Sequence, residues 1–129
     1  MTKQEMQEIY NRLLELTKGG KVKWEKVGRS EYVRNFSQSS VAVEKDWNCE
    51  PPMIVLKIYN QDGHLIAIAS DDIDALIEEE NEVERLTLDP SELFDLVQSQ
   101  VYKYSETTTN LLDELRKLEP SLSERRESK

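Results

Sequence analysis

The chain has 129 residues, of which 37% are hydrophobic, and a formal net charge of −9. A chain of this length suits one domain that buries a working core without disulfides or metals. Cys49 is the single cysteine, which excludes an internal disulfide framework. The longest strongly apolar run, residues 53–56, is far shorter than the ~20 residues of a membrane span. We therefore expect a cytoplasmic protein without a membrane segment.

An N-terminal helix is predicted over residues 3–18. Thr2 and Glu5 match a capping box, and Gly19 and Gly20 end the periodic pattern. Between these signals, apolar side chains recur at intervals of three and four residues, at Met6, Ile9, Leu13 and Leu16. The helix is therefore predicted to have one apolar face.

Five short strands are predicted next, because apolar and polar residues alternate as in strands with one solvated face. The run 53–59 is apolar on both faces apart from Lys57, which favours a central position, and residues 60–63 form a tight turn after it. The predicted strands span residues 21–27, 31–36, 40–45, 53–59 and 64–69. Together they indicate an antiparallel meander of about five strands.

Charge is unevenly distributed, and residues 70–95 hold eleven carboxylates against one cation, Arg85. We interpret residues 78–84 as a charged connector, because this run lacks a clear apolar face. By contrast, residues 18–34 hold six cations against two carboxylates. The acidic segment is a candidate partner surface, formed by Asp71, Asp72, Asp74, Glu78, Glu79, Glu80 and Glu82.

One continuous C-terminal helix is predicted over residues 90–118. Asp89 and Pro90 match the start of a helix, and apolar residues then recur at alternating intervals of three and four. The favoured interpretation is that this seam packs on the sheet and the first helix; the alternative is that a second copy covers it in a homodimer. Three threonines at 107–109 could also break the helix into two. The candidate interface residues are Val97, Val101, Tyr104, Thr108, Leu111, Leu115 and Leu118.

The order of elements predicts an α+β fold with an N-terminal helix, an antiparallel meander, an acidic connector and a long C-terminal helix. Residues 1–119 are assigned to one domain. The apolar pattern ends near Pro120, and the Ser-, Glu- and Arg-rich residues 120–129 are predicted to be a disordered tail.

No constellation of residues indicates catalysis. Cys49 and His64 are the only thiol and imidazole, and the strand between them separates them by about 20 Å or more. They do not make a tetrahedral zinc site, and Asp71, Asp72 and Asp74 do not complete a site for a hard cation. Neither G-x-G-x-x-G nor G-x-S-x-G occurs. We expect no enzymatic activity, no cofactor and no metal.

Trp24 and Tyr32 lie within the basic segment, and aromatic residues among cations are typical of a nucleic-acid surface. However, alternation places Trp24 with Val22 on the apolar side, and the acidic half of the chain repels phosphates. We therefore expect no direct nucleic-acid binding. Another role for the aromatic residues is a pocket for a small molecule or peptide, lined by Trp24, Tyr32, Tyr59 and Tyr104.

The start of the chain combines a leucine-rich helix with the pattern Thr-x-x-Gly-x-Val-x-Trp. The residues that carry this pattern are Leu13, Leu14, Leu16, Thr17, Gly20, Val22 and Trp24. With the meander sheet and C-terminal helix, it resembles a group of small prokaryotic and phage-like proteins of unestablished function. The resemblance implies a bacterial or phage origin, and it implies no catalytic residues.

The sequence thus favours a small cytoplasmic, non-enzymatic protein that acts by binding another protein. Such a protein would be an adaptor, an immunity or antitoxin-like partner, or a phage factor that binds a host protein. The first alternative is a module that binds a small molecule or peptide between the sheet and the helices. The second is an acidic mimic of nucleic acid, in which the carboxylates of the connector stand in for phosphates.

Overall fold

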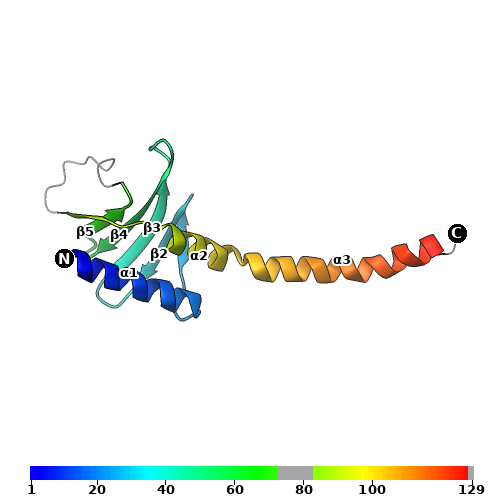
Figure 1. Cartoon of the computed structure of the whole chain (residues 1–129). Helices are drawn as coiled ribbons and strands as arrows, with labels where there is room; N and C mark the ends of the chain where they lie inside the picture. The colour runs from blue at the N-terminus through cyan, green and yellow to red at the C-terminus, as the bar shows by residue number, and fades with distance from the viewer. Residues whose placement is uncertain (73–82, 128–129) are drawn as a thin grey trace.

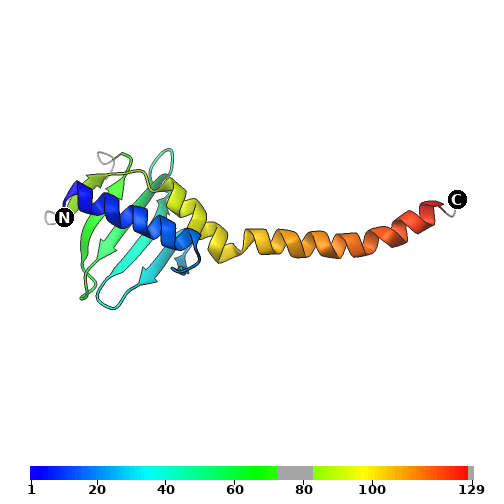
Figure 2. The ribbon, with the colours of Figure 1, turned by 60° about the horizontal axis from the view of Figure 1, so that its bottom comes forward.

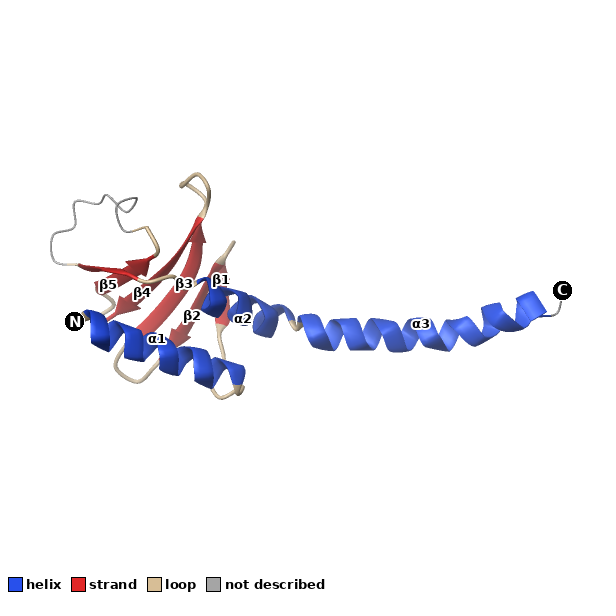
Figure 3. Cartoon of the chain, in the orientation of Figure 1, coloured by secondary structure: helices blue, strands red, loops and turns tan. Residues whose placement is uncertain are grey.

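The computed structural model describes residues 1–72 and 83–127, without the side chains of residues 105 and 120–127. The predicted α+β class is confirmed, with an N-terminal helix, a six-stranded sheet and two C-terminal helices (Figures 1 and 3). In chain order the elements are α1 (Lys3–Lys18), β1 (Glu25–Gly28), β2 (Glu31–Asn35), β3 (Ser40–Asp46), β4 (Met53–Tyr59), β5 (Leu65–Ser70), β6 (Glu84–Thr87), α2 (Ser91–Tyr102) and α3 (Tyr104–Glu127).

The sheet has the order β1-β2-β3-β4-β5-β6, and its first five strands form the predicted antiparallel meander. Of the charged connector predicted at residues 78–84, residues 78–82 lie outside the described residues, and Glu84 is the first residue of a strand that was not predicted, β6, which pairs in parallel with β5. Leu86 of β6 packs against the core, although its neighbours Glu84 and Arg85 are charged. A four-residue strand with one strongly apolar side chain gives too weak an alternation to be predicted.

Helices α1 and α2 lie side by side across one face of the sheet (Figure 2). The capping box predicted for α1 is present, since the Thr2 hydroxyl accepts from the Glu5 N–H and the Glu5 carboxylate accepts from the Thr2 N–H. The buried face of α1 includes Tyr10 and Thr17, whereas Leu16 is 42% exposed. The main core lies between these helices and the sheet and includes Met6, Leu13, Trp24, Tyr32, Val43, Leu56, Leu93, Phe94 and Val97.

The opposite face of the sheet carries a second, smaller apolar cluster. Met53, Val55 and Ile68 are buried there, with Cys49 and Val83 packed against them. The neighbouring part of this face is polar, where Lys57 forms an ion pair with Glu44. The two faces of the meander are therefore chemically different.

Two helices replace the single C-terminal helix predicted over residues 90–118. Lys103 caps α2 in the left-handed conformation, with φ 55° and ψ 48°, and α3 begins at the next residue. The break thus falls at Lys103, and the three threonines considered as helix breakers lie inside α3. One left-handed residue changes the direction of the backbone without disturbing the spacing of apolar residues, so periodicity did not reveal it.

Helix α3 extends away from the sheet and from both other helices (Figures 1 and 2). Its 24 residues correspond to about 36 Å. It continues to Glu127, past the end predicted at Leu118, and Pro120 lies inside it. The molecule therefore consists of a layered domain and a long helical arm.

Candidate interaction surface

The arm carries a stripe of exposed leucines, which we name the leucine stripe: Leu111, Leu112, Leu115 and Leu118. Their exposed fractions are 55%, 43%, 46% and 62%. Spacing of three and four residues places them on one side of the helix. A row of neighbouring exposed leucines on one element differs from the scattered apolar residues of an ordinary surface and is typical of an interaction site.

The structure divides the predicted interface into two parts. Val97 is fully buried and Val101 is half-buried, so both belong to the domain rather than to a free surface. Tyr104, Thr108, Leu111, Leu115 and Leu118 are exposed along α3. Leu112, which is not among the predicted interface residues, is also exposed, and the apolar face of a helix is wide enough to include it.

Aromatic rings connect the arm to the domain. The rings of Tyr102 and Tyr104 stack on either side of the break, with centroids 5.7 Å apart and planes 7° apart. Tyr102 also meets the edge of buried Tyr32 at 6.5 Å, and the Lys26 ammonium lies 6.0 Å from its centroid. The base of the arm is therefore held by ring contacts that lead into the core.

Charged side chains of α3 lie beside and behind the leucine stripe. Asp113 and Arg116 form an ion pair at 3.4 Å, and both are well exposed. Glu114 and Glu119 occupy the two flanks of the stripe, on opposite sides of it. Any partner that lies along the stripe therefore meets carboxylates on both sides.

The predicted acidic surface is only partly within the described residues. Asp71 and Asp72 are exposed at the end of β5. The other five members, Asp74, Glu78, Glu79, Glu80 and Glu82, lie outside the described residues.

The four aromatic residues of the predicted pocket do not line one cavity. Trp24 and Tyr32 are buried in the main core, where the Trp24 indole N–H donates to the Thr17 hydroxyl at 3.0 Å. Tyr59 lies on the opposite face of the sheet, where desolvation raises its pKa; the nearby Glu44 carboxylate also raises the pKa, and the Lys57 ammonium opposes the shift. Tyr104 is 49% exposed on α3. The alternation of Val22 and Trp24 correctly indicated that Trp24 is buried, although the strand predicted at residues 21–27 begins only at Glu25. The separation of the other residues depends on the tertiary fold.

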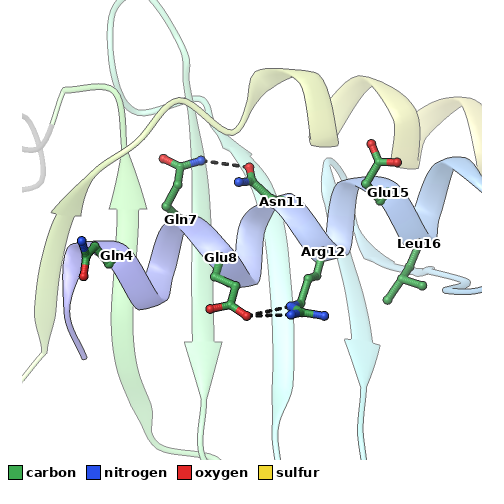
Figure 4. A pocket seen from close by; sticks show the side chains of 7 residues that line it. All are labelled: Gln4, Gln7, Glu8, Asn11, Arg12, Glu15 and Leu16. Carbon is green, nitrogen blue, oxygen red and sulfur yellow. Dashed lines mark hydrogen bonds and ion pairs between the residues drawn. The ribbon is translucent and has the colours of Figure 1, made fainter.

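The outer face of α1 presents a shallow hollow between its side chains (Figure 4). All seven lining residues come from this one helix, and all are exposed: Gln4, Gln7, Glu8, Asn11, Arg12, Glu15 and Leu16. Gln7 donates to Asn11, and Glu8 pairs with Arg12, so neighbouring turns satisfy these polar groups. A single exposed helix face does not enclose a ligand as a binding pocket does.

Cys49 lines another hollow, together with the rest of the loop before β4, the start of β4, Asp71, Asp72 and Ser91. Desolvation and the nearby Asp46 raise the pKa of the Cys49 thiol, which disfavours the reactive thiolate. His64 lies in the turn at the other end of β4, where its backbone N–H donates a hydrogen bond to the Asn60 side-chain oxygen at 3.0 Å. The structure therefore keeps the thiol and the imidazole at opposite ends of one strand.

Arg29 of the basic segment lies against an exposed aromatic ring, that of Trp47, which follows β3. The Arg29 guanidinium lies 4.7 Å from its centroid and the Lys45 ammonium 4.5 Å. The indole N–H donates to the Ser30 hydroxyl at 3.2 Å. These contacts occupy the ring, so it is not a free platform on which a base could stack.

Within residues 1–72 and 83–127, no helix is both long and apolar enough to cross a membrane. In the same part of the chain, no group of three or more His, Cys, Asp and Glu side chains is placed to hold a metal ion. No protein-family model, curated protein or solved structure matches the chain. The resemblance of its opening residues to small prokaryotic and phage-like proteins therefore stays a prediction.

Proposed function

We propose that this protein is a cytoplasmic, non-enzymatic interaction protein that binds a protein partner through the leucine stripe of α3. The observation that carries the proposal is the exposure of four leucines, between 43% and 62%, on an arm that leaves the domain. Exposed apolar surface costs free energy in water, and a helix face of this kind is recognised by a helix or a hydrophobic groove.

The domain supports this role by holding the base of the arm. α2 is anchored in the core by Leu93, Phe94 and Val97, and α3 follows it after one residue. A rigid base reduces the conformational entropy that a docking helix loses on binding. An adaptor, an immunity or antitoxin-like protein and a phage factor that binds a host protein would all use such an arrangement.

The test compares two variants that introduce the same charge on opposite sides of α3. Leu115→Glu places a carboxylate in the leucine stripe, whereas Asn110→Glu places one on the far side. We expect the whole chain to form a complex, in purified form or in extract of its host, that Leu115→Glu removes and Asn110→Glu retains. The proposal is wrong if both variants form the same complexes as the wild-type chain. It is also wrong if neither the wild-type chain nor either variant forms a complex with any protein.

A further inference from the structure

We infer that the leucine stripe binds a second copy of this chain, and that the two α3 helices pair in antiparallel orientation. This inference rests on the proposed function, because it names the partner of the same stripe. The domain itself leaves α3 uncovered, since α1 and α2 already occupy the helix-bearing face of the sheet (Figure 2). The layered domain of the same chain therefore does not cover the leucine stripe, and the surface that covers it belongs to another molecule.

The charges of α3 disfavour a membrane surface as the occupant. Residues 104–119 contain four carboxylates, Glu106, Asp113, Glu114 and Glu119, against two cations, Arg116 and Lys117. Helices that lie on anionic membranes carry an excess of lysine and arginine on the polar face. A helix with a leucine stripe and mixed charges beside it matches the surface of a helical pair better.

The flanking charges also distinguish the two orientations of such a pair. With Leu115 at a heptad a position and Leu111 and Leu118 at d, Glu114 falls at g and Glu119 at e. In a parallel pair, g of one helix faces the following e of the other, so Glu114 would face Glu119 of the second copy twice. Two symmetric contacts between like charges oppose the parallel arrangement.

An antiparallel pair brings equivalent flanks together, so the e flank of one helix lies beside the e flank of the other. That flank carries Leu112, Arg116 and Glu119. When Leu115 lies opposite Leu118 of the second copy, Glu119 comes within about 3 Å, along the axis, of Arg116 of the second copy. Symmetry makes this ion pair twice, and opposed helix dipoles add to the preference.

The same register also separates the Glu114 side chains. Their positions differ by about 7.5 Å along the axis when Leu115 faces Leu118, whereas pairing Leu115 with Leu111 would bring them within about 3 Å. The leucines and the flanking charges therefore select one register together. In this arrangement the two layered domains lie at opposite ends of the helical pair.

The first measurement is the mass of the whole purified chain by sedimentation equilibrium, up to about 1 mM. We expect a concentration-dependent dimer. Leu115→Glu should raise the dimer dissociation constant by about 100-fold or more, and Asn110→Glu should change it by less than about twofold. A wild-type chain that stays monomeric over the whole range overturns the inference.

Charge reversal then tests the orientation. In the antiparallel register, Arg116→Glu and Glu119→Arg each place like charges together and weaken the dimer, by about threefold to tenfold. An equimolar mixture of the two variants should recover dimer, because both interhelical pairs become attractive again. If Glu119→Arg alone strengthens the dimer, the helices are parallel and the inference is wrong, since that change would pair Arg with Glu114.

Small-angle X-ray scattering gives an independent test that needs no substitution. Antiparallel arms predict two separate maxima in the distance distribution, from domains at opposite ends, whereas parallel arms place the domains side by side. The inference fails separately from the proposed function: a monomeric chain that binds a different protein through Leu115 overturns only the self-association. A chain with no association of either kind overturns both.

Discussion

Helices α2 and α3 share one apolar spacing but have opposite environments. Leu93, Phe94 and Val97 of α2 are at most 3% exposed, whereas Leu111 and Leu118 of α3 are more than half exposed. The difference arises at one residue, since the left-handed Lys103 turns the chain away from the core. Apolar periodicity therefore identifies the apolar face of a helix. Whether the sheet and the other helices cover that face depends on the direction in which the helix runs.

Hydrogen bonds distinguish the two helices as clearly as burial does. The Gln100 side chain of α2 accepts a hydrogen bond from the backbone N–H of Trp24 at 2.8 Å and donates one to the backbone carbonyl of Val22 at 2.9 Å. At the other end of α2, the Tyr10 hydroxyl accepts from the Leu93 N–H at 3.3 Å. α2 is thus tied at both ends to segments far away in sequence, and this anchoring makes it part of the domain.

The largest expected difference comes from truncating matched leucines. Leu93→Ala should lower the free energy of unfolding of the domain by about 2–5 kcal/mol, because it leaves a cavity in a closed core. Leu115→Ala should change it by less than about 0.5 kcal/mol, because the side chain contacts little of the domain. Urea unfolding followed by tryptophan fluorescence, at low protein concentration, measures both. Equal losses would show that α3 folds with the core.

The anchoring of α2 is tested by removing its amide side chain. Gln100→Ala should cost about 2 kcal/mol, because the Trp24 N–H and the Val22 carbonyl both lose their partner in a partly buried site. Asn110→Ala is the matched change in α3 and should cost less than about 0.5 kcal/mol. The same unfolding experiment applies, and a negligible effect of Gln100→Ala would mean that water replaces these bonds.

Tyr10→Phe removes the hydroxyl that accepts from Leu93 and should cost about 1 kcal/mol at neutral pH. Desolvation raises the pKa of Tyr10 above its ordinary 10.0, so the folded state holds the phenol proton more tightly than the unfolded state. This contribution is complete below the unfolded pKa and is lost as the pH rises through the folded pKa.

The stability difference between wild type and Tyr10→Phe should therefore shrink as the pH rises from about 9 to about 11. Tyr32→Phe is the control, because the Tyr32 hydroxyl is buried without a well-aligned hydrogen-bond partner in the described part of the chain. That change should cost little or stabilise slightly at neutral pH. A Tyr10→Phe difference that is constant with pH would contradict the assignment.

The smallest effect is expected at the break itself. Lys103→Gly should stabilise the domain by about 0.5 kcal/mol, since relief of the left-handed strain slightly exceeds the entropy that glycine adds to the unfolded chain. Lys117→Gly is the control within α3 and should instead lower helix content in far-ultraviolet circular dichroism. A loss of stability in Lys103→Gly would show that the lysine side chain itself holds the turn.

Local signals predicted the elements that have clear punctuation. The capping box of Thr2 and Glu5 placed the start of α1, and the tight turn after Tyr59 placed the β4–β5 hairpin. β6 escaped prediction because its ladder partner is β5, and a parallel partner leaves no turn signal beside the strand. Lys103 escaped it because lysine carries no preference for the left-handed region.

The candidate site was likewise partly predictable. Spacing alone identified Leu111, Leu115 and Leu118 as members of an apolar face, and no tertiary information was needed for that. Their exposure was not predictable, because the same pattern continues from the buried Val97 without any change in residue type. The exposure of Leu112 likewise depends on the tertiary structure, because α3 is a separate helix that leaves the domain.

The sequence by itself determined the α+β class, the order of helix and meander, and the apolar faces of the helices, because these depend on capping residues, turns and periodicity over short distances. The tertiary structure alone decided which of those faces is core and which is surface. That division depends on contacts between Tyr10 and Leu93, between Trp24 and Gln100, and on the turn at Lys103. These interactions join segments about 80 residues apart or act at a single backbone angle, and neither leaves a local pattern in the chain.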